Sequence, residues 1–110
     1  MSLWTLDSAL EFIRELHHVL NEAGFAAALT GSVLIRGESD NDLDLVIYPL
    51  NAAECSYTAL REGLEGAGMK IKFPRHIVAR AWHSRGSNDI KTVEAWETPG
   101  GRRVDLFLLR

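Results

Sequence analysis

The sequence predicts an α+β protein built around a single β-sheet. Segments with apolar residues at three- and four-residue steps alternate with short apolar runs that glycine or proline ends. The chain has 110 residues, of which 46% are hydrophobic and 25% charged. This size and composition suit one hydrophobic core. We therefore expect a single domain over residues 1–110.

The chain begins with a predicted amphipathic helix over residues 7–23. Asp7 or Ser8 is a suitable N-cap, and Gly24 ends the pattern. Its apolar positions repeat at helical spacing: Leu6, Leu10, Ile13, Leu16, Leu20 and Ala23. Residues 25–29 follow as a short apolar run, which predicts a buried strand.

The middle of the chain predicts a turn, a loop and a second strand. Gly31-Ser32 turns out of the first strand, and residues 33–36 form a brief helical turn. Residues 38–41 are polar and predict a loop. Residues 42–48 alternate polar and apolar side chains and predict a strand that Pro49 ends.

The second half predicts one more helix and the remaining strands. The predicted elements are a helix over 52–67, strands over 69–73, 76–83 and 90–97, a turn over 98–101 and a closing strand over 103–109. With helices mainly on one side, the other face of the sheet would be partly bare. Trp82, Trp96 and Phe107 are candidates for it, and a homodimer or hetero-complex is expected.

Charge and cysteine content exclude several classes of function. The net charge of −3 argues against strong non-specific binding of nucleic acid. Cys55 is the single cysteine, which rules out an intrachain disulfide and a cysteine zinc site. No apolar run approaches the roughly 18 residues of a membrane span, and no signal pattern opens the chain. We expect a cytoplasmic protein that does not enter a membrane.

Two acids stand in an unusual place, within the apolar strand "DLDLVIY". Successive strand residues face opposite ways, so Asp42 and Asp44 share one face, with α-carbons about 6.6 Å apart. Carboxylates so placed repel each other unless a cation lies between them. Mg²⁺, or Mn²⁺ in its place, suits such a pair.

A solvated turn is the alternative interpretation of these acids. It explains Asp40 and Asn41 well, but it explains Asp44 poorly because apolar residues flank that position. A calcium loop of the EF-hand type fails, because Leu45 and Asn51 stand where Gly and Glu are required.

A third acid, Asp105, stands in the closing strand "RVDLFLL". The alternative to a functional role is an edge-strand aspartate paired with Arg102 or Arg103. If this strand lies beside residues 42–48, three carboxylates converge on one face. Such a cluster would hold two metal ions about 3.5–4 Å apart for an in-line phosphoryl displacement.

Gly31 and Ser32 are candidates for contact with a phosphate. Glycine lets the backbone approach a ligand closely, and the amides of the following turn can bind an anion. Gly-Ser occurs in many turns, so its position ten residues before Asp-x-Asp is what makes it informative.

Together these motifs resemble the DNA polymerase β-type nucleotidyltransferase superfamily. The resemblance rests on Gly31-Ser32, Asp42-Leu43-Asp44 and Asp105 in "VDLFL", and covers residues 25–48 and 103–109 well. It implies a nucleotidyltransferase-like fold, in which a mixed β-sheet is backed by helices. It also implies catalytic, metal-binding roles for Asp42, Asp44 and Asp105. It also implies that Gly31 and Ser32 hold the triphosphate of a nucleotide.

The resemblance predicts a small metal-dependent nucleotidyltransferase. It would transfer a nucleoside monophosphate from a nucleoside triphosphate (ATP or another) to a hydroxyl acceptor that the sequence does not identify. The alternative is a non-catalytic nucleotide- or metal-binding module, or a toxin–antitoxin-type partner of the same fold. A helical protein partner is conceivable because larger family members add a helical domain.

Overall fold

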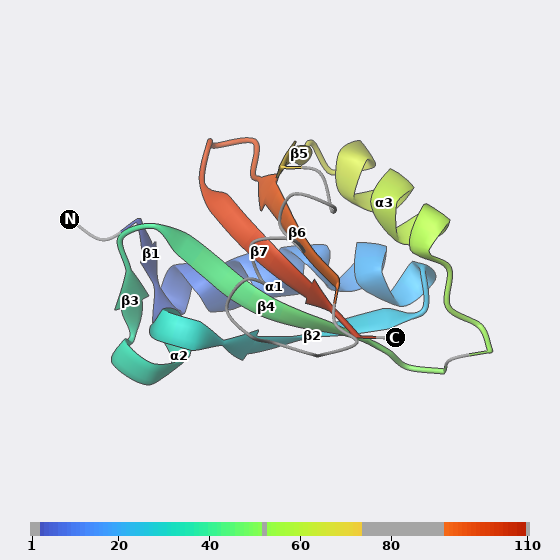
Figure 1. Ribbon diagram of the computed structural model, residues 1–110, viewed down its shortest axis with the longest axis horizontal. Coiled ribbons are helices and arrows are strands. Elements are labelled where there is room, and N and C mark those ends of the chain that lie inside the picture. The colour runs from blue at the N-terminus through green and yellow to red at the C-terminus, as the bar shows by residue number, and fades with distance from the viewer. Residues whose placement is uncertain (1–2, 52, 74–91, 110) are drawn as a thin grey trace.

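The computed structural model describes residues 3–51, 53–73 and 92–109, and Figure 1 shows their arrangement. In chain order the elements are β1 (Trp4–Thr5), α1 (Leu6–Glu22), β2 (Phe25–Thr30), α2 (Gly31–Arg36), β3 (Glu38–Ser39), β4 (Asp42–Pro49), α3 (Tyr57–Gly66), β5 (Lys70–Phe73), β6 (Thr92–Glu97) and β7 (Arg103–Leu108). None of the helices in these ranges is long and apolar enough to cross a membrane.

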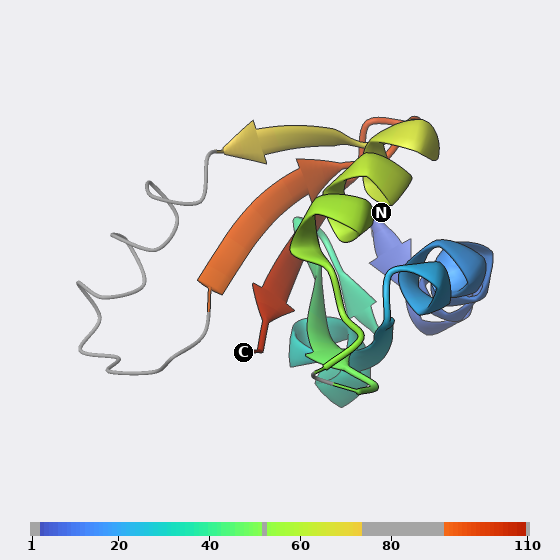
Figure 2. The same cartoon turned by 90° about the vertical axis from the view of Figure 1, so that its right-hand side faces the viewer.

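A five-stranded mixed sheet organises the molecule, in the order β2-β4-β7-β6-β5. The central strands β4 and β7 run parallel, and every other neighbouring pair is antiparallel. Figure 2 shows α1 and α3 on the same side of this sheet. The predicted α+β class, with a mixed sheet backed by helices, is therefore confirmed.

The core lies between the sheet and these two helices. Residues of β4 alternate between buried and half-buried up to Ile47, as period-two patterning requires. The apolar side chains that the strands β4 and β7 bury there are Leu43, Leu45, Ile47, Val104, Leu106 and Leu108. Leu16 and Leu20 of α1 and Leu60 and Leu64 of α3 pack against them. The central strands are thus fixed by their helix-covered face.

The start of α1 differs from the prediction. Thr5 is the N-cap, and its side chain and that of Ser8 form a reciprocal capping box. The buried face passes through Ala9 and Phe12, whereas the predicted positions Leu6 and Leu10 are 41% and 39% exposed. Phe12 packs against Trp4, with ring centroids 5.4 Å apart. This contact with β1 decides which side of the first helical turns is buried.

Two further boundaries also differ from the prediction. The predicted loop over 38–41 contains β3, which pairs with β1 in a small two-stranded sheet. The predicted helix over 52–67 begins only at Tyr57, because the Ser56 side chain caps it by accepting a hydrogen bond from the Ala59 amide.

The prediction that three aromatic side chains lie on an uncovered face of the sheet is partly wrong. Trp96 is fully buried in the core, and its indole N–H donates to Glu94. Phe107 is half-buried. Trp82 and the strand predicted over 76–83 lie outside the described residues. Of the three aromatic residues proposed for an association surface, Trp96 is excluded because it belongs to the covered face.

Candidate active site

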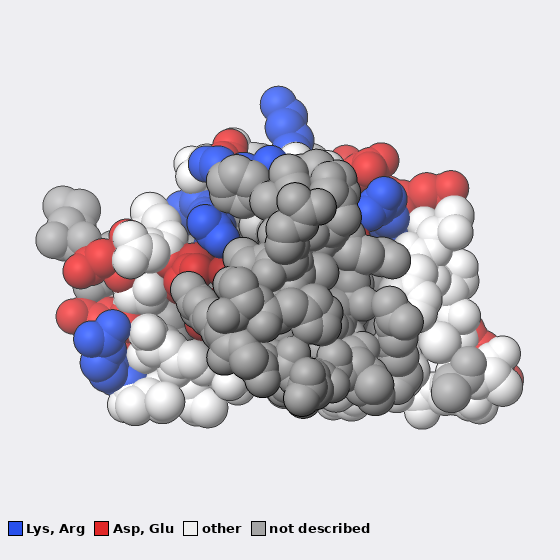
Figure 3. Space-filling view, viewed as in Figure 1, with Lys and Arg blue, Asp and Glu red and all other residues white. Residues whose placement is uncertain are grey.

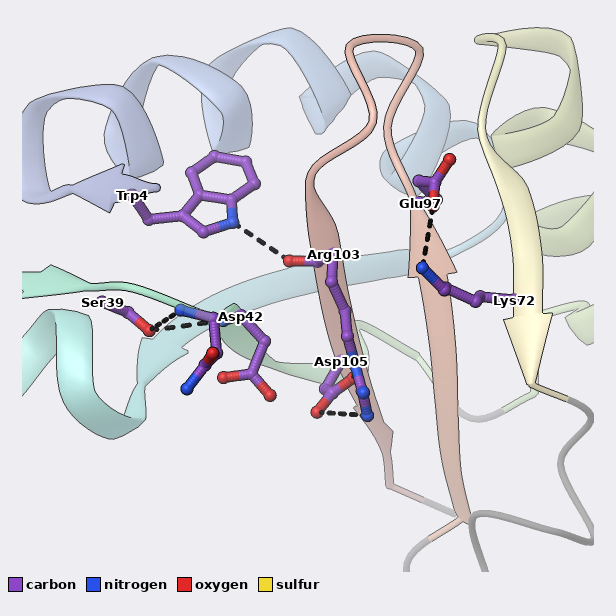
Figure 4. A network of polar contacts seen from close by, with 8 residues as sticks. Trp4, Ser39, Asp42, Lys72, Glu97, Arg103 and Asp105 are labelled. Atoms are coloured by element: carbon purple, nitrogen blue, oxygen red, sulfur yellow. Dashed lines mark hydrogen bonds and ion pairs between the residues drawn. The ribbon is translucent and has the colours of Figure 1, made fainter. Parts of the chain in front are cut away.

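The parallel pairing of β4 with β7 brings the three predicted acids together. Asp44 lies directly opposite Asp105, and Asp42 lies opposite Arg103. One carboxylate oxygen from each of the three acids lies within 4.8 Å of the others. Figure 4 shows Asp42 and Asp105 turned toward each other from neighbouring strands. The geometric condition of the sequence hypothesis, that the two acidic strands be neighbours, is met.

Burial and mutual repulsion shape the electrostatics of the cluster. Burial raises the pKa of Asp44 to about 7, with further increases from the charges of Asp42 and Asp105. The pKa of Asp105 rises to about 6, first through burial and then through its hydrogen bond with Asp42, while Arg103 opposes the increase. At neutral pH the three carboxyl groups therefore favour the binding of a positive charge, either a proton or a cation.

The donor set fits a hard divalent cation. Carboxylate oxygens are the ligands that Mg²⁺ and Mn²⁺ accept most readily, and the three aspartates offer oxygens at mutual distances a bridging ion can span. Asp105 is buried, whereas Asp42 and Asp44 are half-buried. The cluster therefore lies partly inside the protein and is open to solvent at Asp42 and Asp44. The repulsion described above is a cost that a bound cation would remove.

Arg103 supplies a cation from the protein itself. Its Nε–H donates to Oδ1 of Asp105 at 2.9 Å, and Nη2 donates to Oδ2 at 3.4 Å. The ion pair between Asp105 and Arg103, which the alternative interpretation predicted, is thus present. The strand is not an edge strand, because β7 lies between β4 and β6. Arg102, the other candidate partner, instead places its guanidinium over the Trp4 ring, 3.9 Å from the centroid.

Gly31 lies against the cluster because β2 pairs with β4. Thr30 is opposite Asp44, and Gly31 follows with a φ of +74°. A Cβ at Gly31 would overlap the Asp44 carboxylate and come within 3.0 Å of the Asp44 Cβ. Glycine is therefore needed twice, for its backbone conformation and for its lack of a side chain. Ser32, the next residue, is half-buried at the start of α2.

Two residues that support the site were not recognised in the sequence. Ser39 is buried, and its hydroxyl accepts hydrogen bonds from the amides of Asn41 and Asp42, both at 3.3 Å. Trp4 donates its indole N–H to the Arg103 carbonyl at 3.0 Å. The turn-forming run Ser39-Asp40-Asn41 carried a signal for the first contact, whereas no local pattern predicts the second.

The space-filling view agrees with this placement of charge. In Figure 3 acidic side chains gather at the left of the visible face, around β3 and the start of β4, with basic side chains beside them. Asp40 is exposed in the turn, as expected. Lys72 is exposed and pairs with Glu97 at 3.2 Å (Figure 4).

Comparison with solved structures identifies proteins of similar fold. No protein-family model and no curated protein matches the sequence. Among solved structures, a cytoplasmic RNA terminal U-transferase superposes with a TM-score of 0.62 at 12% identity, over 94% of this chain and 28% of that protein. Cid1 in complex with the UTP analogue UMPNPP superposes with a TM-score of 0.57 at 13% identity, over 94% of this chain and 30% of Cid1.

The chain thus has the fold of one part of these two proteins and spans less than a third of their length. This likeness confirms the predicted nucleotidyltransferase-like fold. At such low identity it establishes the fold alone.

Proposed function

We propose that this protein is a metal-dependent nucleotidyltransferase that moves a nucleoside monophosphate from a nucleoside triphosphate to a hydroxyl acceptor. The observation that carries the proposal is the meeting of Asp42, Asp44 and Asp105 beside the Gly31-Ser32 turn. The fold shared with a terminal U-transferase and with Cid1 bound to a UTP analogue supports it.

Each residue has a role in this proposal. Asp42, Asp44 and Asp105 would hold Mg²⁺ or Mn²⁺, which when bound would neutralise the charge that develops on the phosphates. Gly31 lets the chain pass close to Asp44, which would bring the backbone amides of Gly31 and Ser32 to the site. These amides and the Ser32 hydroxyl would hold the triphosphate.

The reaction is an in-line displacement at the α-phosphorus. A bond forms from the acceptor oxygen to this phosphorus, the bond from the α-phosphorus to the bridging oxygen breaks, and pyrophosphate leaves. The proton of the acceptor hydroxyl would pass to a carboxylate oxygen of Asp105, which lies in the same cluster. The three carboxylates would hold the metal ion, and Asp105 would in addition orient the acceptor hydroxyl and accept its proton.

The test combines binding with transfer. Calorimetric titration with ATP, GTP, CTP and UTP in Mg²⁺ should reveal binding of at least one nucleotide, and chelation of the metal should abolish it. Incubation with the α-³²P-labelled form of that nucleotide and a panel of hydroxyl acceptors should transfer label and release pyrophosphate. Absence of metal-dependent binding for all four nucleotides would refute the catalytic proposal.

A non-catalytic binding module of the same fold is the second candidate, and one observation favours it. Arg103 already places a positive charge on Asp105, so the cluster is partly neutralised without a metal ion. Nucleotide or metal binding without transfer to any acceptor, alone or with a helical partner protein, would support this module.

A further inference from the structure

The Arg103 guanidinium contacts the acidic cluster through Asp105. Nε and Nη2 reach different oxygens of the Asp105 carboxylate, at 2.9 Å and 3.4 Å, so the contact is two-pronged. Asp105 has only 12% of its side chain exposed, whereas Arg103 has 38%. The carboxylate is therefore fixed in the protein, and the guanidinium borders solvent.

The backbone beneath this side chain is held in place. The indole N–H of the buried Trp4 donates to the carbonyl of Arg103. The register of β7 against β4 sets Arg103 opposite Asp42. The strand is therefore held in place, and displacement of the guanidinium would be a movement of the side chain.

The charges make the contact with Arg103 and the binding of a metal ion mutually unfavourable. Burial disfavours the charged form of Arg103, but the hydrogen bond with Asp105 and the charges of Asp105, Asp42 and Asp44 outweigh it and raise the pKa of Arg103. The same three carboxylates are the candidate metal ligands. A divalent cation among them would repel a guanidinium that touches one of them and would compete for the same oxygens.

Resting on the proposed function, we propose that Arg103 is a built-in counter-ion of the metal-free carboxylate cluster and that metal binding displaces its guanidinium from Asp105. Arg103 thereby stabilises the fold without metal and lowers the affinity of the cluster for a metal ion alone. It is a positioning residue, since it acts through Asp105.

The first experiment is a calorimetric titration with Mn²⁺ alone, without nucleotide, on the wild type and Arg103→Met. It is carried out at about pH 8, one unit above the pKa of Asp44, so that protons do not compete for the carboxylates. We expect Arg103→Met to bind Mn²⁺ about fivefold more tightly or better, the lower end of typical couplings between two sites. Arg103→Lys keeps the positive charge and should return the affinity toward that of the wild type.

Arg102→Met is the matched control. It removes the same charge from the neighbouring residue, whose guanidinium lies over Trp4. Its Mn²⁺ affinity should stay within about twofold of the wild type, since the Arg102 guanidinium lies on the Trp4 ring whereas that of Arg103 contacts Asp105.

A second measurement does not depend on the folding of Arg103→Met. Nitrogen-15 NMR should show an arginine Nε–H signal that exchanges slowly with water in the metal-free protein. Saturating Mg²⁺ should accelerate this exchange on the order of tenfold as the hydrogen bond to Asp105 is lost. The signal should be missing from Arg103→Lys, which assigns it even if Arg103→Met does not fold.

The outcomes separate this proposal from the proposed function. Binding of Mn²⁺ by the wild type with equal or weaker binding by Arg103→Met would overturn the counter-ion role alone. An Arg103 Nε–H that stays protected in saturating Mg²⁺ would do the same. Binding by Arg103→Met but not by the wild type would support the counter-ion role in its strongest form. Absence of metal binding in both proteins would contradict the proposed function as well.

Discussion

On the helix-covered face of β4 and β7, six apolar side chains are buried, none more than 2% exposed. On the opposite face of the same two strands, three carboxylates lie within 4.8 Å of one another. Period-two alternation separates the two faces by a single residue, as between Leu43, Asp44 and Leu45. Burial on one face can thus hold together like charges that repel on the other. The residues that stabilise the fold and the residues of the candidate site therefore alternate along the same strands.

The largest expected effect concerns the apolar face. Leu45→Ala should lower the free energy of unfolding by about 2–5 kcal/mol, because it leaves a cavity at a fully buried position. Val46→Ala, on the half-buried opposite face, should cost clearly less. Chemical denaturation measures both values. Equal losses of unfolding free energy would mean that the apolar face does not stabilise the fold more than the opposite face.

The next effect concerns the point where backbone and site meet. Gly31 and Gly37 both have positive φ, but a Cβ at Gly37 would meet nothing within 4 Å, whereas one at Gly31 would overlap Asp44. Gly37→Ala should cost about 1 kcal/mol for its backbone conformation alone. Gly31→Ala should cost about 1–3 kcal/mol more, as overpacking does, and should weaken metal binding.

Thermal and chemical unfolding of both glycine variants, with Mn²⁺ titrations, test this pair. Identical costs with unchanged metal affinity would show that Gly31 serves the turn only and has no role beside Asp44.

A smaller effect concerns pH in the absence of metal. The pKa of Asp44 is about 7 in the fold against 3.8 as the unperturbed value, so the folded state binds more protons between these two pH values. Stability from this group is therefore fully present below about pH 4 and is lost as the pH rises through 7. Because Asp44 is half-exposed, solvent screening reduces the loss to about 1–2 kcal/mol.

Asp44→Asn should remove most of this loss and stabilise the metal-free protein above pH 7. Urea denaturation in a chelating buffer at about pH 5 and pH 8 gives the comparison. A stability difference between the two pH values that is as large in Asp44→Asn as in the wild type would assign it to other groups.

Local patterns in the sequence predicted much of the site but not its supports. The alternation in "DLDL" predicted that Asp42 and Asp44 share a face, because strand geometry is local. Whether Asp105 joined them depended on β7 lying beside β4, which the sequence left as a condition. The two-pronged contact from Arg103 and the bond from Trp4 depend on register between distant segments, and so periodicity could not supply them.

The fold shows the same division between local and tertiary control. The strands of the sheet and the helix from residue 7 onward follow from periodicity, whereas the buried face of α1 is decided by the packing of Trp4 on Phe12. Trp96 illustrates the same limit, because an aromatic residue in a strand gives no indication of which face it occupies until the neighbouring strands are known.

The central claim is that Asp42, Asp44 and Asp105 form one metal-binding cluster. The most direct test is the melting temperature with and without ~10 mM Mg²⁺ for the wild type, Asp44→Asn and Asp40→Asn. At a hundredfold excess over Kd the wild type should gain about 2.7 kcal/mol, and its melting temperature should rise accordingly. Asp44→Asn should lose most of this response, and Asp40→Asn, in the exposed turn, should keep it. Equal responses in all three proteins would contradict the claim and return the acids to a solvated turn.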